Sequence, residues 1–387
     1  MGLTTYPSSG VVTPTSAVNK LLSIAPFSGS SDALFLDNKS IAGRIIYPWS
    51  TLAGEPGLPG TNTGGGFGIV NDSALTAVTF DALTSLSGSI KLYEDPSLTT
   101  LSLPLLASLE GRLSLSANDS LTALLLPALQ SCAGALEIYQ HAAMTEIDLS
   151  ALASCAGSLQ IFNTALTSLD LSAVQSIGAM NVGVNDALTS LDLSALTTIN
   201  PGGLVQIFNN PALVALDLSR LTTIHGQLSL PANAITSVSL GALQTLTGSF
   251  SVNGDGAVVS VDLSGLTQIP AGAQVQLRSC GALTSVSISS IVSIAGGLEV
   301  SSCGFITSVT VAASIALSND FLISFADSAL DNATVDAILA ACAAGMGGTN
   351  SGTLDLSGGS NATPTGGTSN SDYLTLSGAG ITVNINS

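Results

Sequence analysis

The stretch Leu188-Thr-Ser-Leu-Asp-Leu-Ser-Ala-Leu-Thr-Thr-Ile199 is one copy of a motif that recurs eleven times between Leu75 and Ala329. A repeat of this length predicts a solenoid, because one unit is too small to bury its apolar face and must stack on its neighbours. The copies begin 22 to 25 residues apart, at Leu75, Leu98, Leu121, Met144, Leu166, Leu188, Leu213, Ile235, Val258, Leu283 and Ile306.

Each unit contains two alternating segments. Apolar residues fall three and five positions after the first residue, as in Leu188, Leu191 and Leu193, and a second alternation precedes each unit, as in Leu228-Ser-Leu230. A period of two predicts short strands with one buried side. We therefore predict a mainly β chain, a parallel β-solenoid of about eleven coils with two strands per coil, two parallel sheets and no helix within the coils.

A small polar residue precedes most units by three positions. Adjacent coils of a parallel solenoid lie roughly 4.8 Å apart, so a polar side chain here can satisfy backbone groups of its own coil and of the next. The predicted polar ladder comprises Asp72, Asp95, Asn118, His141, Asn163, Asn185, Asn210, Ala232, Asp255, Cys280, Cys303 and Asp327.

The repeated L-T-x-L-x-L pattern with Asn, Asp or Cys in the ladder resembles the leucine-rich-repeat superfamily, in particular the irregular coils of BspA-type surface proteins and receptor L domains. The resemblance covers about two thirds of the chain. It implies a right-handed solenoid that binds protein or glycan. The chain departs from animal repeats in having no room for a long convex helix and in its many Thr and Ser residues.

The composition favours a rigid, exposed protein over a catalyst. Hydrophobic residues make up 46% of the 387 residues and charged residues 8%, with 7 Lys and Arg against 25 Asp and Glu. So few cations cannot neutralise phosphates, which argues against nucleic acid and anionic membranes as partners. No apolar run has membrane-spanning length, and residues 1–7 show no secretion signal. The few cleavage points for trypsin-like proteases suit an extracellular location, on a virion or a cell surface.

The pattern divides the chain into residues 1–70, a solenoid at 71–329 and a C-terminal capping module at 330–387. The first segment carries no repeat, holds the one Trp, Trp49, and has apolar runs at 33–36 and 43–47 that could form strands. It is either a cap on the first coil or a docking segment that fixes the solenoid to a larger assembly. The sequence leaves both interpretations open.

The C-terminal module begins with a predicted amphipathic helix that follows an N-cap at Asn332 and ends at Gly345. Strands are expected at 353–356, 373–376 and 381–385. The run from Val335 to Leu339, followed by residues 354–364, resembles a module of bacterial and phage structural proteins. That resemblance implies a virion or surface-appendage origin.

Five cysteines are too few for a disulfide framework in a chain of this size. Cys280 with Cys303, and Cys132 with Cys155, fall at equivalent positions of consecutive coils, within bridging range. We favour buried free thiols over disulfides, because Cys packs in such ladders as a small hydrophobe. Cys342 lies in the predicted helix and is expected in its core.

Carboxylates form a second column four residues after the first residue of several units. Such a column could bind Ca²⁺ or serve a polysaccharide-cleaving solenoid enzyme. A solvated face is the preferred interpretation, because no Lys or Arg shares the register. His141 and His225 are isolated and support neither a catalytic triad nor a metal site. The column comprises Asp148, Asp170, Asp192, Asp217 and Asp262.

Aromatic and amide side chains mark the outward side of the second alternating segment. They form a plausible platform for a sugar, a protein or a second copy of the chain, or they shield the sheet and mediate lateral packing. The aromatic column is Tyr93, Tyr139, Phe162 and Phe208, and the neighbouring polar column is Lys91, Glu137, Gln160, Asn181, Gln206, Gln276 and Glu299.

Together these features predict a non-enzymatic structural or adhesive protein, above all a phage fibre, tail or decoration component that binds a protein or glycan. The alternatives are a bacterial surface adhesin and a calcium-dependent enzyme that cleaves polysaccharides.

Overall fold

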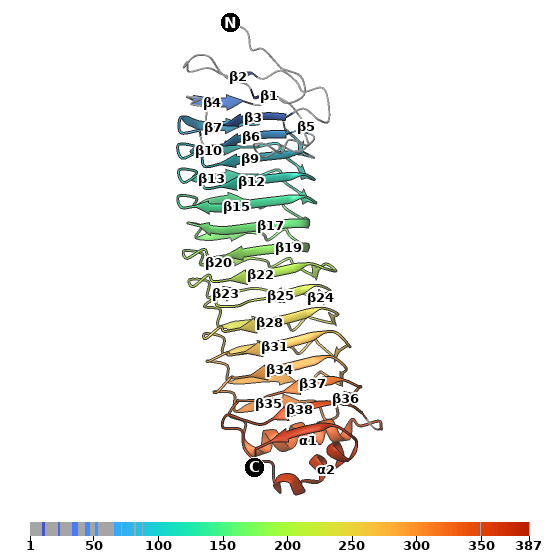
Figure 1. Ribbon diagram of the computed structural model, residues 1–387. Coiled ribbons are helices and arrows are strands. Elements are labelled where there is room, and N and C mark those ends of the chain that lie inside the picture. The colour runs from blue at the N-terminus through green and yellow to red at the C-terminus, as the bar shows by residue number, and fades with distance from the viewer. Residues whose placement is uncertain are drawn as a thin grey trace. The chain divides into compact units, whose positions relative to one another are not determined.

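The computed structural model describes residues 72–80, 83–86, 88–348 and 350–386, together with six strands that precede them. The chain divides into two compact units, residues 1–192 and 193–387. Both are built from coils of parallel strands (Figure 1). The fold class is a mainly β parallel solenoid of about 11 turns with C-terminal helices and strands.

A typical coil of unit 1 contains three strands. The first strands are β7 (Leu75–Thr79), β10 (Thr100–Ser102), β13 (Ala123–Leu125), β16 (Glu146–Asp148), β18 (Ser168–Asp170) and β20 (Ser190–Asp192). The two-residue second strands are β8 (Ser85–Leu86), β11 (Ser108–Leu109) and β14 (Ser131–Cys132). The third strands are β9 (Ser89–Tyr93), β12 (Arg112–Ser116), β15 (Ala135–His141), β17 (Ser154–Thr164) and β19 (Ser176–Gly183). In β17 and β19 the second and third strands are fused.

Six strands lie before residue 71: β1 (Gly10–Val11), β2 (Leu22–Ser23), β3 (Ala33–Asp37), β4 (Gly43–Ile46), β5 (Thr51–Leu52) and β6 (Gly66–Val70). Three of them pair in parallel with strands of the repeats, β6 with β9, β4 with β7 and β5 with β8. The other three pair in parallel within the segment, β1 with β3, β2 with β4 and β3 with β6. The expected strands at 33–36 and 43–47 are therefore present. The segment has no repeat in its sequence, yet its strands follow the coil pattern. Its remaining residues, with Trp49, lie outside the described part of the chain.

Unit 2 repeats the same coil. Its first strands are β23 (Ala215–Leu216), β26 (Ser237–Ser239), β29 (Ser260–Asp262), β32 (Ser285–Ile288) and β35 (Ser308–Val311). Its second strands are β21 (Thr198–Ile199), β24 (Thr223–Ile224), β27 (Thr245–Leu246), β30 (Gln268–Ile269), β33 (Ser293–Ile294) and β36 (Ala316–Leu317). Its third strands are β22 (Leu204–Phe208), β25 (Gln227–Ser229), β28 (Ser249–Asn253), β31 (Gln274–Arg278), β34 (Gly297–Ser301) and β37 (Phe321–Ser324). The prediction of two strands per coil thus missed the short second strand.

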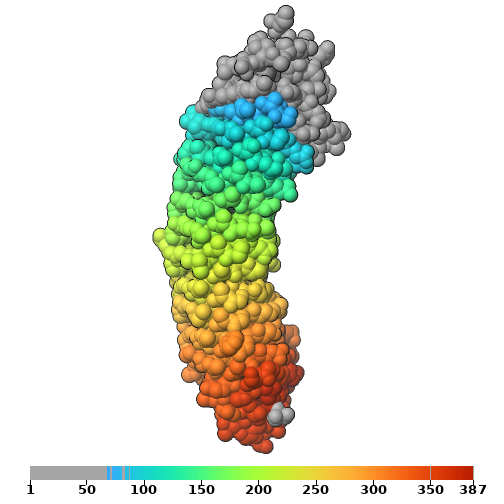
Figure 2. Space-filling model, turned by 90° about the vertical axis from the view of Figure 1, so that its left-hand side faces the viewer, coloured from blue at the N-terminus to red at the C-terminus, as the bar shows by residue number. Residues whose placement is uncertain are grey.

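The C-terminal residues of unit 2 continue its stack of parallel strands. They form the red end of the surface, next to the orange residues that precede them (Figure 2). Strand β38 (Gly352–Leu356) pairs in parallel with β37, and β39 (Thr382–Ile385) with β38. Helix α1 (Asn332–Ala344) precedes β38, and η1 (Gly367–Ser369) and α2 (Ser371–Gly378) precede β39.

Two local predictions for this module are wrong. The N-cap of α1 is Asp331, whose carboxylate accepts the Thr334 N–H at 2.8 Å, and not Asn332. Residues 373–376 lie in α2 instead of a strand, because Asn370 caps a helix there by accepting the N–H groups of Asp372 and Tyr373. No helix among the described residues is long and apolar enough to cross a membrane.

The core is built from the inward residues of the strands. Leu188, Leu191 and Leu193 are at most 3% exposed, as the alternation predicted. Glycine at one corner of the coil allows close stacking: a Cβ on Gly157 would lie 1.8 Å from the carbonyl oxygen of Gly134. No side chain fits at that distance, so glycine is required there.

Asparagines of the polar ladder join their coil to the one before it. Asn118 donates from Nδ2 to the Leu92 carbonyl at 3.1 Å, and its Oδ1 accepts the Asp95 N–H at 2.9 Å. Asn185 makes the same two bonds to Ile161 and Thr164, at 3.2 and 3.0 Å. Because buried backbone groups need partners, these side chains stabilise the turn between coils.

Three predicted ladder positions are displaced by one residue. Asn163, Ala232 and Asp327 have positive φ angles of 55°, 55° and 53°, and the ladder side chain follows each of them. The ladder residue is therefore the one that follows the left-handed residue of the turn. The spacing from the ladder residue to the first residue of the next unit varies by one. The buried ladder residues are Asp72, Asp95, Asn118, His141, Thr164 and Asn185 in unit 1, and Asn210, Asn233, Asp255, Cys280, Cys303 and Ser328 in unit 2.

Candidate functional site

The outward face of the third strands in unit 1 carries an aromatic column. The strand register aligns Tyr93, Ser116, Tyr139 and Phe162 on successive coils. The rings of Tyr139 and Phe162 stack in parallel, with centroids 5.5 Å apart and planes 8° apart. Ser116 separates Tyr93 from this pair. Phe208 belongs to unit 2, where it lies half-buried at the end of β22.

A polar column adjoins the rings. The register aligns Lys91, Ser114, Glu137, Gln160 and Asn181. The Tyr139 hydroxyl donates to Oε1 of Gln160, and Nε2 of Gln160 donates to the Ser158 hydroxyl at 2.8 Å. Burial raises the pKa of Tyr139 to about 12, so its hydroxyl stays protonated at neutral pH. The stacked rings and Gln160 therefore form a preorganised surface with both apolar and hydrogen-bonding groups. Gln206 holds the corresponding outward position in unit 2.

The carboxylate column has a local structural role. Asp170 accepts the Ser172 N–H at 2.9 Å, and three further residues make the same bond to the serine two positions later: Asp148, Asp217 and Asp262. The Ser172 hydroxyl and then the Ser172 N–H lower the pKa of Asp170, so this carboxylate is ionised.

The register brings two of these carboxylates together. Asp170 pairs with Asp192 on adjacent strands of unit 1, whereas Asp262 lies between Ser239 and Ser287 in unit 2. Within the residues that the structure describes, no cluster of three or more His, Cys, Asp or Glu side chains could hold a metal ion. Calcium binding stays a prediction.

The five cysteines are buried free thiols. Cys132 pairs with Cys155 in register, and the hydrogen bond between them, followed by burial, raises the pKa of Cys155. Cys280 and Cys303 replace ladder asparagines: their thiols donate to the carbonyl groups of Val252 and Leu277 at 3.5 and 3.6 Å. These cysteines are placed for packing and weak hydrogen bonds, not for nucleophilic chemistry.

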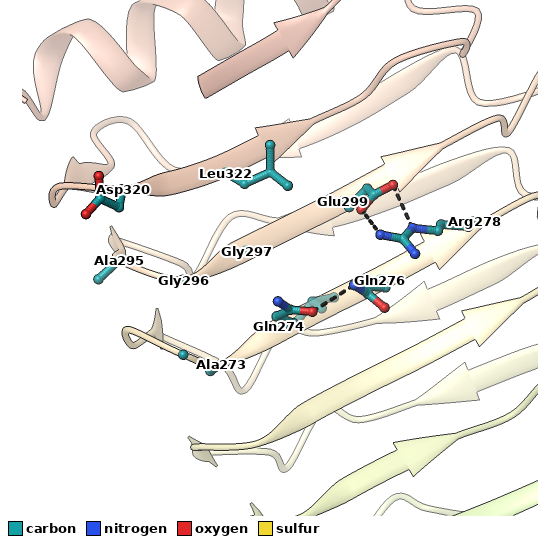
Figure 3. Close-up of a pocket in the computed structure, with 12 residues that line it drawn as sticks. Ala273, Gln274, Gln276, Arg278, Ala295, Gly296, Gly297, Glu299, Asp320 and Leu322 are labelled. Carbon is teal, nitrogen blue, oxygen red and sulfur yellow. Dashed lines mark hydrogen bonds and ion pairs between the residues drawn. The ribbon is translucent and has the colours of Figure 1, made fainter. Parts of the chain in front are cut away.

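A hollow of about 230 Å³ lies on the outward face of unit 2 (Figure 3). It is lined by three successive third strands, β31, β34 and β37. The polar columns predicted from the sequence included Gln276 and Glu299 but missed Gln274, Gly297 and Leu322, which also line it. The sequence signal for this hollow was Gly297, because the equivalent position of the preceding coil is Gln274.

Comparison with known proteins gives no sequence-level match. No protein-family model and no curated protein matches the chain. Two solved structures overlap with it: the functional domain of InlJ from Listeria monocytogenes, described as including a cysteine ladder, and TLR13 in complex with ssRNA13. The InlJ structure is 17% identical, with 74% of this chain and 69% of that chain covered and a TM-score of 0.25. The TLR13 structure is 14% identical, with 84% and 68% covered and a TM-score of 0.24. Both overlaps are partial, and the fold assignment rests on the strand register of the chain itself.

Proposed function

We propose that this chain is a non-enzymatic structural or adhesive protein of a virion or cell surface. It holds a glycan or protein partner on the outward face of the third strands in unit 1. The observation that carries the proposal is the parallel stack of Tyr139 on Phe162, with Gln160 fixed beside it.

The chemistry of this surface favours binding over catalysis. Aromatic rings offer large apolar faces at low entropic cost, and an oriented amide both donates and accepts hydrogen bonds. Arg112 and Glu137 lie 3.8 Å apart on the same face and partly neutralise each other. Such a surface suits a partner with mixed polar and apolar groups, such as the face of a sugar ring.

A virion component, namely a phage fibre, tail or decoration protein, is the first form of this proposal. The resemblance of residues 335–364 to modules of phage and bacterial structural proteins supports it. A bacterial surface adhesin is the alternative. Capsid or tail genes beside this gene would favour the virion, and cell-wall anchoring or secretion genes would favour the adhesin.

The test is the double variant Tyr139→Ala with Phe162→Ala, measured by binding of labelled protein to a microbial glycan array and to intact bacterial cells. We expect at least tenfold weaker binding than for the unchanged protein, since central aromatic residues dominate such interfaces. The matched control is Phe305→Ala, which removes an aromatic ring of unit 2 that is 67% exposed. Equal loss in both variants, or no loss in the double variant, contradicts the proposal.

A further inference from the structure

The hollow in unit 2 exists because one outward position lacks a side chain. The register places Gly297 between Gln274 on the coil before and Leu322 on the coil after. The two neighbours form opposite ends of the hollow, and Glu299, two residues along β34, lines it as well (Figure 3).

Packing does not require glycine at position 297. A Cβ there would meet Gln274 Cγ at 3.6 Å, which is ordinary van der Waals contact. Gly296 differs, because its Cβ would lie 2.2 Å from the Ala273 carbonyl oxygen. Stacking of the coils therefore accounts for Gly296 but leaves Gly297 without a structural reason. Any larger side chain at 297 would occupy the hollow.

The polar groups around the hollow pair with one another. Gln276 donates from Nε2 to Oε1 of Gln274 at 2.8 Å, which leaves the Gln274 Nε2 group and the Gln276 Oε1 atom outside that bond. Arg278 forms a two-pronged ion pair with Glu299, and the Ser301 hydroxyl donates to the same carboxylate at 2.8 Å. Side chains that are already paired lose less conformational freedom on binding than unpaired ones.

The lining combines apolar groups with side-chain amides. Leu322, which is 38% exposed, supplies an apolar wall together with Ala295. The lining holds one cation, Arg278, which pairs with Glu299, and a second carboxylate, Asp320, so an anionic ligand is disfavoured. A volume of about 230 Å³ is below the roughly 300 Å³ at which typical ligand pockets begin, so one substituted sugar ring fits better than a larger ligand.

We propose that this hollow binds the 2-acetamido group of an N-acetylhexosamine. The acetyl methyl packs over Gly297 against Leu322, the acetamido carbonyl accepts from Gln274 Nε2, and its N–H donates to Gln276 Oε1. This site lies in unit 2 and is independent of the aromatic column of unit 1.

Saturation-transfer NMR on the full chain tests the site with two trimers that differ only in the acetamido group: β-1,4-linked N-acetylglucosamine trimer and cellotriose. We expect the N-acetylated trimer to bind at least tenfold more tightly, with the strongest saturation on its acetyl methyl groups. Gly297→Leu should abolish this signal without changing the circular dichroism spectrum.

The matched control is Gly256→Leu, in the same unit and with nothing within 4 Å of its added Cβ. This variant should bind like the unchanged protein. Equal affinity for the two trimers, no binding of the N-acetylated trimer, or undiminished binding by Gly297→Leu would each overturn the proposal. Loss of this binding while the array binding of unit 1 persists separates the two sites.

Discussion

The Asp72 N–H donates to Oδ1 of Asp95 at 2.7 Å, whereas Oδ2 of Asp95 is buried without a hydrogen-bond partner. The asparagine at the same position of the next coil, Asn118, uses its second side-chain atom to donate to a backbone carbonyl. An ionised carboxylate cannot donate, and a protonated one can. Burial disfavours the ionised form and raises the pKa of Asp95 to about 7, and the nearby charges of Asp72 and Glu94 add to the effect.

The first prediction concerns Asp95→Asn. The Asp95 carboxyl has a pKa near 7 in the folded chain and about 3.9 in the unfolded chain. Protonation of Asp95 therefore stabilises the folded chain, and this stabilisation is complete below pH 4 and is lost as the pH rises through 7. The amide donates at every pH, so Asp95→Asn should stabilise the chain at pH 8 by up to roughly 4 kcal/mol and give little change at pH 4. Thermal unfolding at pH 4, 6 and 8 measures this difference.

The exposed Asp262→Asn serves as the control for that series. It should show no comparable gain at pH 8. A Tm difference between Asp95→Asn and the unchanged protein that is the same at pH 4 and pH 8 would refute a protonated Asp95.

The second prediction concerns Asn185→Leu. The variant removes the acceptor for the N–H and hydroxyl groups of Thr164 and the donor to the Ile161 carbonyl. Leaving buried groups unpaired costs about 1 to 3 kcal/mol. Urea unfolding followed by circular dichroism should show that loss, and an unchanged midpoint would count against the ladder.

The third prediction uses Asn163, which the sequence pattern wrongly placed in the ladder. Asn163 has a φ of 55°, which glycine adopts without steric strain. Asn163→Gly should therefore leave the free energy of unfolding unchanged or slightly raised. A loss as large as that of Asn185→Leu would show that Asn163 carries a ladder bond after all. The same urea titration compares the two variants.

The fourth prediction addresses the enzyme alternative through Asp170→Asn with Asp192→Asn. The two carboxylates are paired in register, so their replacement relieves like-charge repulsion, and the Asn side chain can still accept the Ser172 N–H. We expect an unchanged or slightly higher Tm and no polysaccharide cleavage by either protein. Turnover of an acidic glycan by the unchanged chain that disappears in the double variant would establish an enzyme.

Much of the fold follows from residues whose chemistry repeats in every coil. The alternation around Leu188, Leu191 and Leu193 identifies the first strands, and Asn118 and Asn185 identify the ladder. Thr164 was missed because the ladder position is set by a left-handed turn, which spacing to the next leucine does not reveal. The helix at 371–378 was missed because four alternating residues are too few to distinguish a strand from a capped helix.

The candidate sites were harder to predict. Alternation shows that Tyr139 and Phe162 face outward, but their stacking depends on a strand register that sequence spacing gives only approximately. The hollow at Gly297 depends on an absent side chain. Only the structure shows that backbone contact requires glycine at position 296 and not at position 297.

The fifth prediction concerns the thiols, for which the sequence left two states open. All five cysteines are buried and free, and Cys280 and Cys303 each donate to a carbonyl as ladder asparagines do. A thiol-specific reagent such as 5,5′-dithiobis(2-nitrobenzoate) should therefore not react with the native chain, and should titrate five thiols per chain in denaturant without reductant. If Cys132 with Cys155 and Cys280 with Cys303 were disulfides, Cys342 alone would react.

Replacing Cys303 by Asn should preserve or raise stability, because an amide is a stronger donor than a thiol, whereas Cys303→Leu should lower it. Equal stability of the two variants would mean that the thiol acts only by filling space.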